Sequence, residues 1–93
     1  MPANPEDLSP SEGERLQDKP DRDTTILLEI VAERERQLEK WGPQEHSVDR
    51  WLVILMEEVG EACVAAFKGD WVNFRDELIQ VAAVAVAIAS GIG

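Results

Sequence analysis

The sequence feature that most constrains the fold is a nine-residue run, Val81 to Ala89, in which every residue is apolar. This run continues a helix that we predict to begin at Asp70 or Asn73 and to end near Ser90. A helix without a polar face has to be buried on every side. A chain of 93 residues can scarcely surround such a helix by itself, because small domains bury a low fraction of their surface. We therefore predict an all-α helical bundle of about three helices per chain, with a core completed by oligomerisation into a dimer or tetramer.

A first helix is predicted to start at a capping residue among positions 23–25 and to end at Trp41, because Gly42 and Pro43 together stop a helix. Residues at helical spacing give this helix one apolar stripe, of the kind that packs on other helices. The stripe consists of Leu27, Ile30 or Val31, Arg34, Leu38 and Trp41.

A second helix is predicted to begin at Ser47 or Asp49, which are both residues that favour an N-cap, and to run to about Lys68. Gly69 then stops it. Its apolar residues also recur with the helical period: Trp51, Leu52, Leu55, Val59, Ala62, Ala66 and Phe67. No alternating strand pattern and no internal repeat is visible in the sequence.

The N-terminal segment differs in composition from the rest of the chain. Residues 1–24 contain four of the five prolines and ten charged residues, with few apolar ones. Such a segment cannot bury enough apolar surface to offset the loss of chain entropy on folding. We therefore expect residues 1–23 to be a disordered acidic tail and residues 24–93 to be one all-α domain.

The overall charge excludes two classes of partner. The formal net charge is −10, from 19 acidic and 9 basic residues, whereas binding to nucleic acid or to anionic membranes requires a basic surface. The longest apolar run is too short to span a bilayer. One cysteine, Cys63, allows no internal disulfide, so we expect a cytoplasmic protein. We predict no nucleic-acid partner and no membrane partner.

Acidic residues form two short clusters on the predicted helices. Glu57, Glu58 and Glu61 lie on the second helix, and Glu58 falls within about 20° of the line through the apolar residues of that helix. Asp76 and Glu77 lie on the third helix. A carboxylate within an apolar stripe is costly to bury unless it is neutralised. If the two helices pack antiparallel, the clusters meet near the turn at Gly69, and a divalent cation would relieve their repulsion. Ligands that are all oxygen favour Mg²⁺, with Mn²⁺ as the alternative.

The alternative reading is that these glutamates form only a solvated helix face, because glutamate is a strong helix former. A spacing of Glu-Glu-x-x-Glu occurs often without any metal ion.

The order of the acidic residues resembles a known family. Glu57-Glu58-Val59-Gly60-Glu61, followed by Glu77-x-x-Gln80 in an apolar helix, is similar to the paired motif of the MazG-like nucleoside triphosphate pyrophosphohydrolases, which are all-α. The family's pattern is Glu-Glu-x-x-Glu and then Glu-x-x-Asp. The stretches 36–42 and 76–85 also resemble its shorter, phage-type members, and the resemblance covers roughly residues 33 to 89.

The resemblance implies metal ligands and a reaction. Glu58, Glu61 and Glu77 would bind Mg²⁺, and Glu57 would hold a second ion or activate the attacking water. Gln80 stands where the family has aspartate, so a neutral amide oxygen would replace a charged ligand. Asp76, one turn earlier on the same face, is a possible compensating group by our own reasoning from helix geometry.

Three further residues are candidate contacts for a substrate. Lys40 could contact a phosphate, Trp41 could stack on a nucleobase, and His46 could orient a phosphate. For each of them a structural role is the alternative: a solvated lysine, a tryptophan at the edge of the core, and a solvated loop histidine.

The sequence therefore predicts a Mg²⁺-dependent enzyme that cleaves a nucleoside triphosphate into a monophosphate and pyrophosphate. The alternative is a non-catalytic helical oligomer that binds a nucleotide or a protein partner. Gln80 keeps this alternative open, because it removes one negative charge from the expected metal site.

Overall fold

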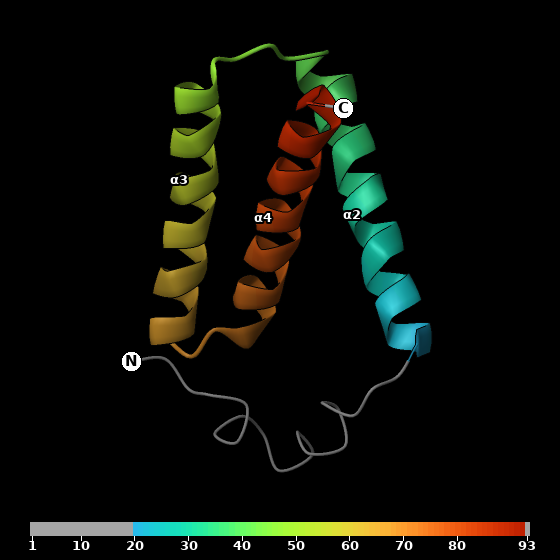
Figure 1. The fold of residues 1–93 in the computed structure, drawn as a ribbon. Coiled ribbons are helices and arrows are strands. Elements are labelled where there is room, and N and C mark those ends of the chain that lie inside the picture. The colour runs from blue at the N-terminus through green and yellow to red at the C-terminus, as the bar shows by residue number, and fades with distance from the viewer. Residues whose placement is uncertain (1–19, 93) are drawn as a thin grey trace.

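The computed structural model describes residues 20–92, and this part of the chain consists of helices and connecting turns without any strand. The helices are α2 (Pro20–Trp41), α3 (Val48–Phe67) and α4 (Trp71–Ile92). The prediction of an all-α fold with three helices is confirmed for these residues (Figure 1). Most of the predicted acidic tail, residues 1–19, lies outside the described residues.

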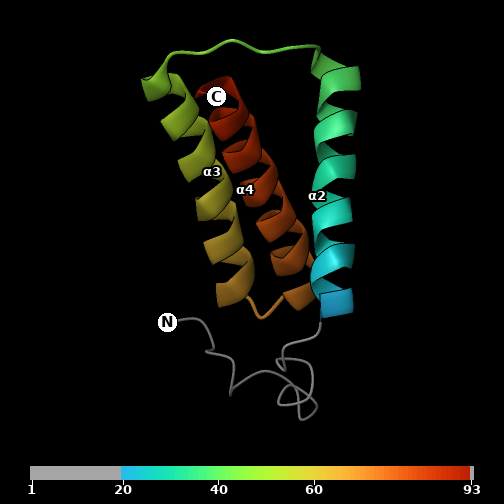
Figure 2. The ribbon, with the colours of Figure 1, turned by 45° about the vertical axis from the view of Figure 1, so that its right-hand side comes forward.

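The helix α4 lies between the other two, as both views of the ribbon show (Figures 1 and 2). It packs against α3 and against α2, whereas the backbones of α2 and α3 do not come close to each other. The chain runs along α2, returns along α3 and runs back along α4. The helix α3 is therefore antiparallel to α2 and to α4 (Figure 1). The segment 42–47 bridges the gap between α2 and α3 (Figure 2).

The helix α2 begins at Pro20, a few residues before the predicted caps. Proline suits the first turn of a helix, because its fixed φ is helical and its missing N–H would have no partner there. Asp21 and Asp23 in the first turn add favourable interactions with the positive end of the helix. Thr25, one of the predicted caps, instead lies inside the helix and donates its hydroxyl to the carbonyl of Asp21, at 3.0 Å.

The other helix ends agree with the predictions. Ser47 caps α3 by accepting from the backbone N–H of Arg50 at 3.2 Å. Gly69 has a φ of 69° and follows the end of α3. Its N–H donates to Ala66, and the next N–H donates to Ala65, which together form a Schellman motif. Asp70 then caps α4, because its carboxylate accepts from the N–H of Asn73 at 3.2 Å. The turn between α3 and α4 is therefore tightly defined.

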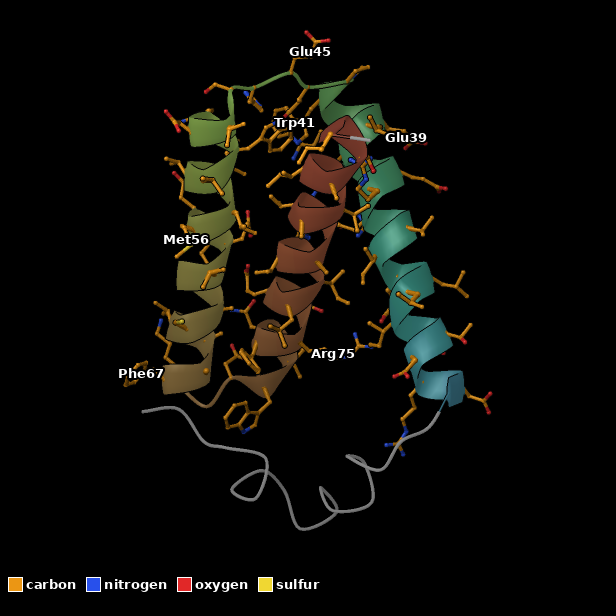
Figure 3. All side chains as sticks on the ribbon, in the orientation of Figure 1. Glu39, Trp41, Glu45, Met56, Phe67 and Arg75 are labelled. Atoms are coloured by element: carbon orange, nitrogen blue, oxygen red, sulfur yellow. The ribbon has the colours of Figure 1, made fainter. Side chains whose placement is uncertain are left out.

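The core of one chain is small. Its buried apolar residues within 20–92 are Ala62, Ala65, Ala66, Ala83 and Val84. No large side chain is completely buried in the described part of the chain. Many large apolar side chains stay exposed, including Phe67 at 69% and Met56 at 61%, on the outer side of α3 (Figure 3). A core this small is what we expect of a protomer whose apolar surface is completed by other copies.

Most of the predicted apolar stripe of α2 is not covered within the single chain. Leu27, Val31, Leu38 and Trp41 are exposed, whereas Ile30 is half-buried. The helix instead turns a polar edge to α4, with Glu29 and Gln37 bonded to residues of that helix. Hydrogen bonds and an ion pair between the two helices therefore help to hold α2 against α4.

The apolar run of α4 is buried on one side only. Ala83 and Val84 are buried, whereas Val86 is 43% exposed and Ala85 and Ala89 are also exposed. Burial on every side, which the sequence predicted, is therefore not reached within one chain. In residues 20–92 no helix combines the length and the apolar character that crossing a bilayer requires.

Candidate metal centre

Three glutamates of the predicted site converge in the structure. Glu58 and Glu61 of α3 and Glu77 of α4 each place one carboxylate oxygen so that the three oxygens lie within 4.8 Å of one another. Glu58 and Glu77 are half-buried, and Glu61 is exposed. The predicted meeting of the two acidic clusters is thus confirmed for these three residues.

The turn at Gly69 explains why these side chains meet. Glu58 and Glu61 are three residues apart and so lie on one side of α3. Glu61 and Glu77 lie eight residues on either side of Gly69, and α3 and α4 are antiparallel. Equal distances from a tight turn bring two residues to the same level of a helical hairpin.

The carboxylates disturb one another electrostatically. Burial, and then the neighbouring charges of Glu61, Glu77 and Glu57, raise the pKa of Glu58 to about 7. Burial and the nearby Glu61 also raise the pKa of Glu77. Glu77 Oε2 is buried and has no hydrogen-bond partner in the described part of the chain. Two carboxylates with a raised pKa, Glu58 and Glu77, and a buried oxygen without a partner mark a place where positive charge is missing.

A small divalent cation fits this arrangement. Two oxygens on opposite sides of Mg²⁺ lie about 4.2 Å apart, because each Mg–O distance is about 2.1 Å. The three glutamate oxygens, within 4.8 Å of one another, need only small side-chain movements to reach one ion. All three ligands are oxygen, which suits Mg²⁺ or Mn²⁺. The group can therefore hold a metal ion.

Two other acidic candidates lie beside this group. Glu57 is exposed on α3, next to Glu58, and its charge contributes to the raised pKa of Glu58. Asp76 is exposed on α4 and lies near Arg75, whose pKa it helps to raise. Neither residue belongs to the three converging glutamates, so each could only support a metal ion held by those three.

A cavity of about 930 Å³ opens beside the glutamates, between α2, α3 and α4. Its volume is that of a site for a small-molecule ligand. Glu58 and Gln80 line it together with aromatic and basic residues: Trp41, Trp51, Arg34, Arg36 and Lys40. Three basic residues thus line the cavity, and three acidic ones, Glu33, Glu39 and Glu58, line it too, so the cavity is less acidic than the chain as a whole.

The predicted substrate contacts are placed differently from one another. Lys40 and Trp41 both line the cavity, with the Lys40 ammonium 4.8 Å from the centre of the Trp41 ring. Trp41 is 61% exposed and lies at the end of the bundle near the 42–47 segment (Figure 3). His46 does not line the cavity itself but contacts two residues that do: its ring packs in a T-shape on Trp51, and its Nε2 lies 3.0 Å from Gln44 Oε1.

Gln80 takes part in a hydrogen-bond network that the sequence did not predict. Its Oε1, the atom expected to bind a metal ion, accepts from Gln37 Nε2 at 3.1 Å. Gln37 Nε2 also donates to Glu33 Oε2 at 3.1 Å, and Arg36 pairs with the other oxygen of Glu33. Glu33 is 7% exposed and is the buried charged residue among residues 20–92. In the sequence, the available indication of this network was that Arg36 and Gln37 follow Glu33 by three and four residues, a spacing that places the three side chains on one side of a helix.

No family model, curated protein sequence or solved structure matches the chain. The resemblance to the MazG-like proteins therefore depends on the motifs alone. The protein is a small three-helix all-α protein, in the part described, with an acidic cluster that can hold a metal ion.

Proposed function

We propose that the protein is a Mg²⁺-dependent nucleoside triphosphate pyrophosphohydrolase, which cleaves its substrate to a monophosphate and pyrophosphate. The observation that carries the proposal is the convergence of Glu58, Glu61 and Glu77 beside a cavity lined by basic and aromatic residues. Their order along the chain also matches the paired motif of the MazG-like family. Mn²⁺ is the alternative ion.

The three glutamates are proposed to bind the cation together. When bound, the ion supplies positive charge that neutralises the triphosphate and lowers the pKa of a coordinated water. Glu58 loses its proton on binding, because a carboxylate has to be ionised to act as a ligand. Glu77 Oε2 gains the partner that it lacks within the described residues.

The cavity residues are proposed to hold the substrate. Lys40, Arg34 and Arg36 line the cavity and suit the phosphate chain, which carries several negative charges. Trp41 presents an exposed ring that can stack on a nucleobase. His46 stays a weaker candidate, because it lies outside this lining.

Glu57 is proposed to act on the attacking water. Its carboxylate is exposed beside Glu58 and can accept the proton of a water whose oxygen attacks the α-phosphorus. The bond between the α-phosphorus and the bridging oxygen then breaks, and pyrophosphate leaves with the electron pair. Positioning and charge carry most of such a reaction.

The test is pyrophosphate release from a panel of ribo- and deoxynucleoside triphosphates, with and without Mg²⁺. The Glu58→Gln variant should lose Mg²⁺-dependent release by at least ~100-fold, since even outer-sphere partners of metal ligands are worth ~10–100-fold. Its apoprotein should be as stable as the parent or slightly more so, because one of three repelling charges is gone. Glu35→Gln, a change at an exposed carboxylate of α2, is the control and should behave as the parent. Full Mg²⁺-dependent release by Glu58→Gln would refute the proposal.

A second candidate function is nucleotide binding without hydrolysis by a helical oligomer. One observation favours it: Gln80 is neutral and its amide oxygen accepts from Gln37, so the site has one negative charge fewer than the family's pattern. Saturable binding of a Mg²⁺–nucleotide complex without any release of pyrophosphate would establish this function instead.

A further inference from the structure

The buried carboxylate of Glu33 determines how the Gln80 side chain is oriented. Glu33 is paired with Arg36 and accepts hydrogen bonds through both oxygens. An ionised carboxylate can only accept. Gln37 therefore has to turn its NH₂ group, and not its oxygen, toward Glu33.

The same NH₂ group of Gln37 then determines which atom of Gln80 faces it. It has two hydrogens, one for Glu33 Oε2 and one for Gln80 Oε1, and each bond is 3.1 Å long. The reverse orientation of Gln80 would bring two NH₂ groups face to face, without any acceptor between them. Because amide orientation follows from the hydrogen-bond network, Gln80 presents its oxygen to Gln37.

The NH₂ group of Gln80 is consequently left to face other partners. No residue in the described ranges accepts a hydrogen bond from it. Gln80 lines the 930 Å³ cavity together with Glu58, Arg34 and Lys40, and it also lines a second cavity of about 360 Å³ between α2 and α4. The hydrogens of an amide NH₂ group carry partial positive charge, so they attract an anionic oxygen and repel a cation.

We infer that Gln80 is a hydrogen-bond donor to a phosphate oxygen of the substrate, held in this orientation by Gln37 and Glu33, and not a metal ligand. The inference rests on the proposed triphosphate site. Gln80 follows Glu77 by one helical turn, which places it beside the metal ligands, where the phosphates have to lie. Gln37 and Glu33 are positioning residues, because they act through Gln80.

The test separates metal binding from phosphate binding by titration calorimetry. The probes are Mg²⁺ alone and then tripolyphosphate at saturating Mg²⁺. Gln80→Leu should bind Mg²⁺ within about twofold of the parent but should bind tripolyphosphate at least ~10-fold more weakly, as for loss of a hydrogen bond to a charged group. Gln80→Glu, which turns the donor into a carboxylate of the same shape, should bind Mg²⁺ more tightly and tripolyphosphate more weakly. Asn73→Leu removes an exposed amide of α4 that lines neither cavity, and should match the parent with both probes.

A double-mutant cycle tests the positioning role. Gln37→Leu should weaken tripolyphosphate binding in the parent, about threefold, and should have no further effect in the Gln80→Leu background. A purely structural role of Gln37 would give the same loss in both backgrounds and would overturn this step.

The outcomes distinguish this inference from the proposed function. If Gln80→Leu weakens Mg²⁺ binding instead, Gln80 is a metal ligand and the inference fails while the proposed function stands. A third probe is a nucleoside triphosphate with a non-cleavable α,β-methylene bridge. If Gln80→Leu weakens the binding of this nucleotide but not of tripolyphosphate, Gln80 contacts the nucleoside, and the assignment to phosphate is wrong. If the parent binds neither Mg²⁺ nor tripolyphosphate, the proposed function itself fails.

Discussion

The hairpin of α3 and α4 and the helix α2 are stabilised by different kinds of interaction. The hairpin is closed by a capped turn and contributes all the buried apolar residues of the described chain, such as Ala65 and Ala83. The helix α2 packs on α4 alone and is bonded to it through polar side chains; Ile26 and Ile30 are half-buried, and its other large apolar residues are exposed. The hairpin therefore has a buried apolar core, to which α2 adds hydrogen bonds but no buried apolar residue.

This difference divides the candidate site between two units. All three converging glutamates belong to the hairpin. Four of the basic and aromatic cavity residues, Arg34, Arg36, Lys40 and Trp41, belong to α2, and Trp51 belongs to α3. Under the proposed function, metal binding would depend on the hairpin, whereas substrate binding would also require α2 in place. Changes in the two units should have separable effects.

The largest effect is expected for a charge placed inside the hairpin. Val84→Asp buries a carboxylate at a position that is 6% exposed, and an unpaired buried charge costs about 3–5 kcal/mol. The variant should lose its helical circular dichroism at 25 °C or melt far below the parent. Val72→Asp is the control, because Val72 is 77% exposed at the start of α4. A parent-like melting curve for Val84→Asp would show that the packed hairpin is not the stable unit.

The outward stripe of α2 is the place to break the oligomer. We expect the parent, with a chain mass of 10.4 kDa, to be a dimer or tetramer at micromolar concentration by light scattering. Replacing Leu27 and Val31 by lysine should shift it to the monomer with little loss of helix, since both side chains are exposed within the chain. Glu35→Lys, on the same helix, should leave the mass unchanged. A parent that is already monomeric would contradict this reading of α2.

The sequence allowed the hairpin to be predicted better than the position of α2. Ser47, Gly69 and Asp70 bond only to residues a few positions away in the sequence. Local chemistry was therefore enough to predict the turn, the caps and the meeting of the glutamates. The packing of α2 depends instead on bonds between residues more than 40 positions apart, such as Arg75 with Glu29. An apolar stripe shows that a helix has a partner but not that the partner lies in the same chain.

The buried Glu33 was missed for a related reason. A glutamate among charged neighbours on a helix is typical of a solvated surface, and only the tertiary arrangement with Gln37 and Gln80 gives it a role. The role of Gln80 as a metal ligand was implied by the family resemblance and stays a prediction; a motif shows which side chains are near a site but not that Gln80 Oε1 accepts from Gln37.

A smaller effect is expected from pH, and it should be confined to the hairpin. The pKa of Glu58 is raised to about 7, above its value in the unfolded chain. The apoprotein should therefore have its full stability contribution from Glu58 at low pH and lose it as the pH rises through 7. Mg²⁺ displaces this proton, so Mg²⁺ affinity should rise up to ~10-fold per pH unit below 7 and level off above it. Melting temperatures from pH 5 to 8 with and without Mg²⁺, for the parent and Glu58→Gln, measure both trends. Curves for the two proteins that vary alike with pH would assign the titration to another group.

The smallest effect is expected where α2 is tied to α4 by an exposed ion pair. Arg75 donates to both oxygens of Glu29, at 3.1 and 2.6 Å, and this lowers the pKa of Glu29. The contribution of the pair is therefore present above the ordinary glutamate pKa and is lost as the pH falls through the lowered value. Glu29→Gln should reduce the melting temperature only slightly, because exposed ion pairs contribute little. Hydrogen exchange should become faster in α2 but not in α3 or α4, and equal acceleration in all three helices would show that they open as one unit.

The short distance along the chain between the candidate ligands has a consequence for the order of assembly. Glu58 and Glu77 bound a segment of twenty residues with the capped turn inside it. Contacts between residues close in sequence form early in folding, because little chain entropy is lost in closing the loop between them. We therefore expect the acidic group to form when α3 meets α4, without needing α2. If the group binds Mg²⁺ as proposed, the ion would then stabilise the hairpin by itself during refolding.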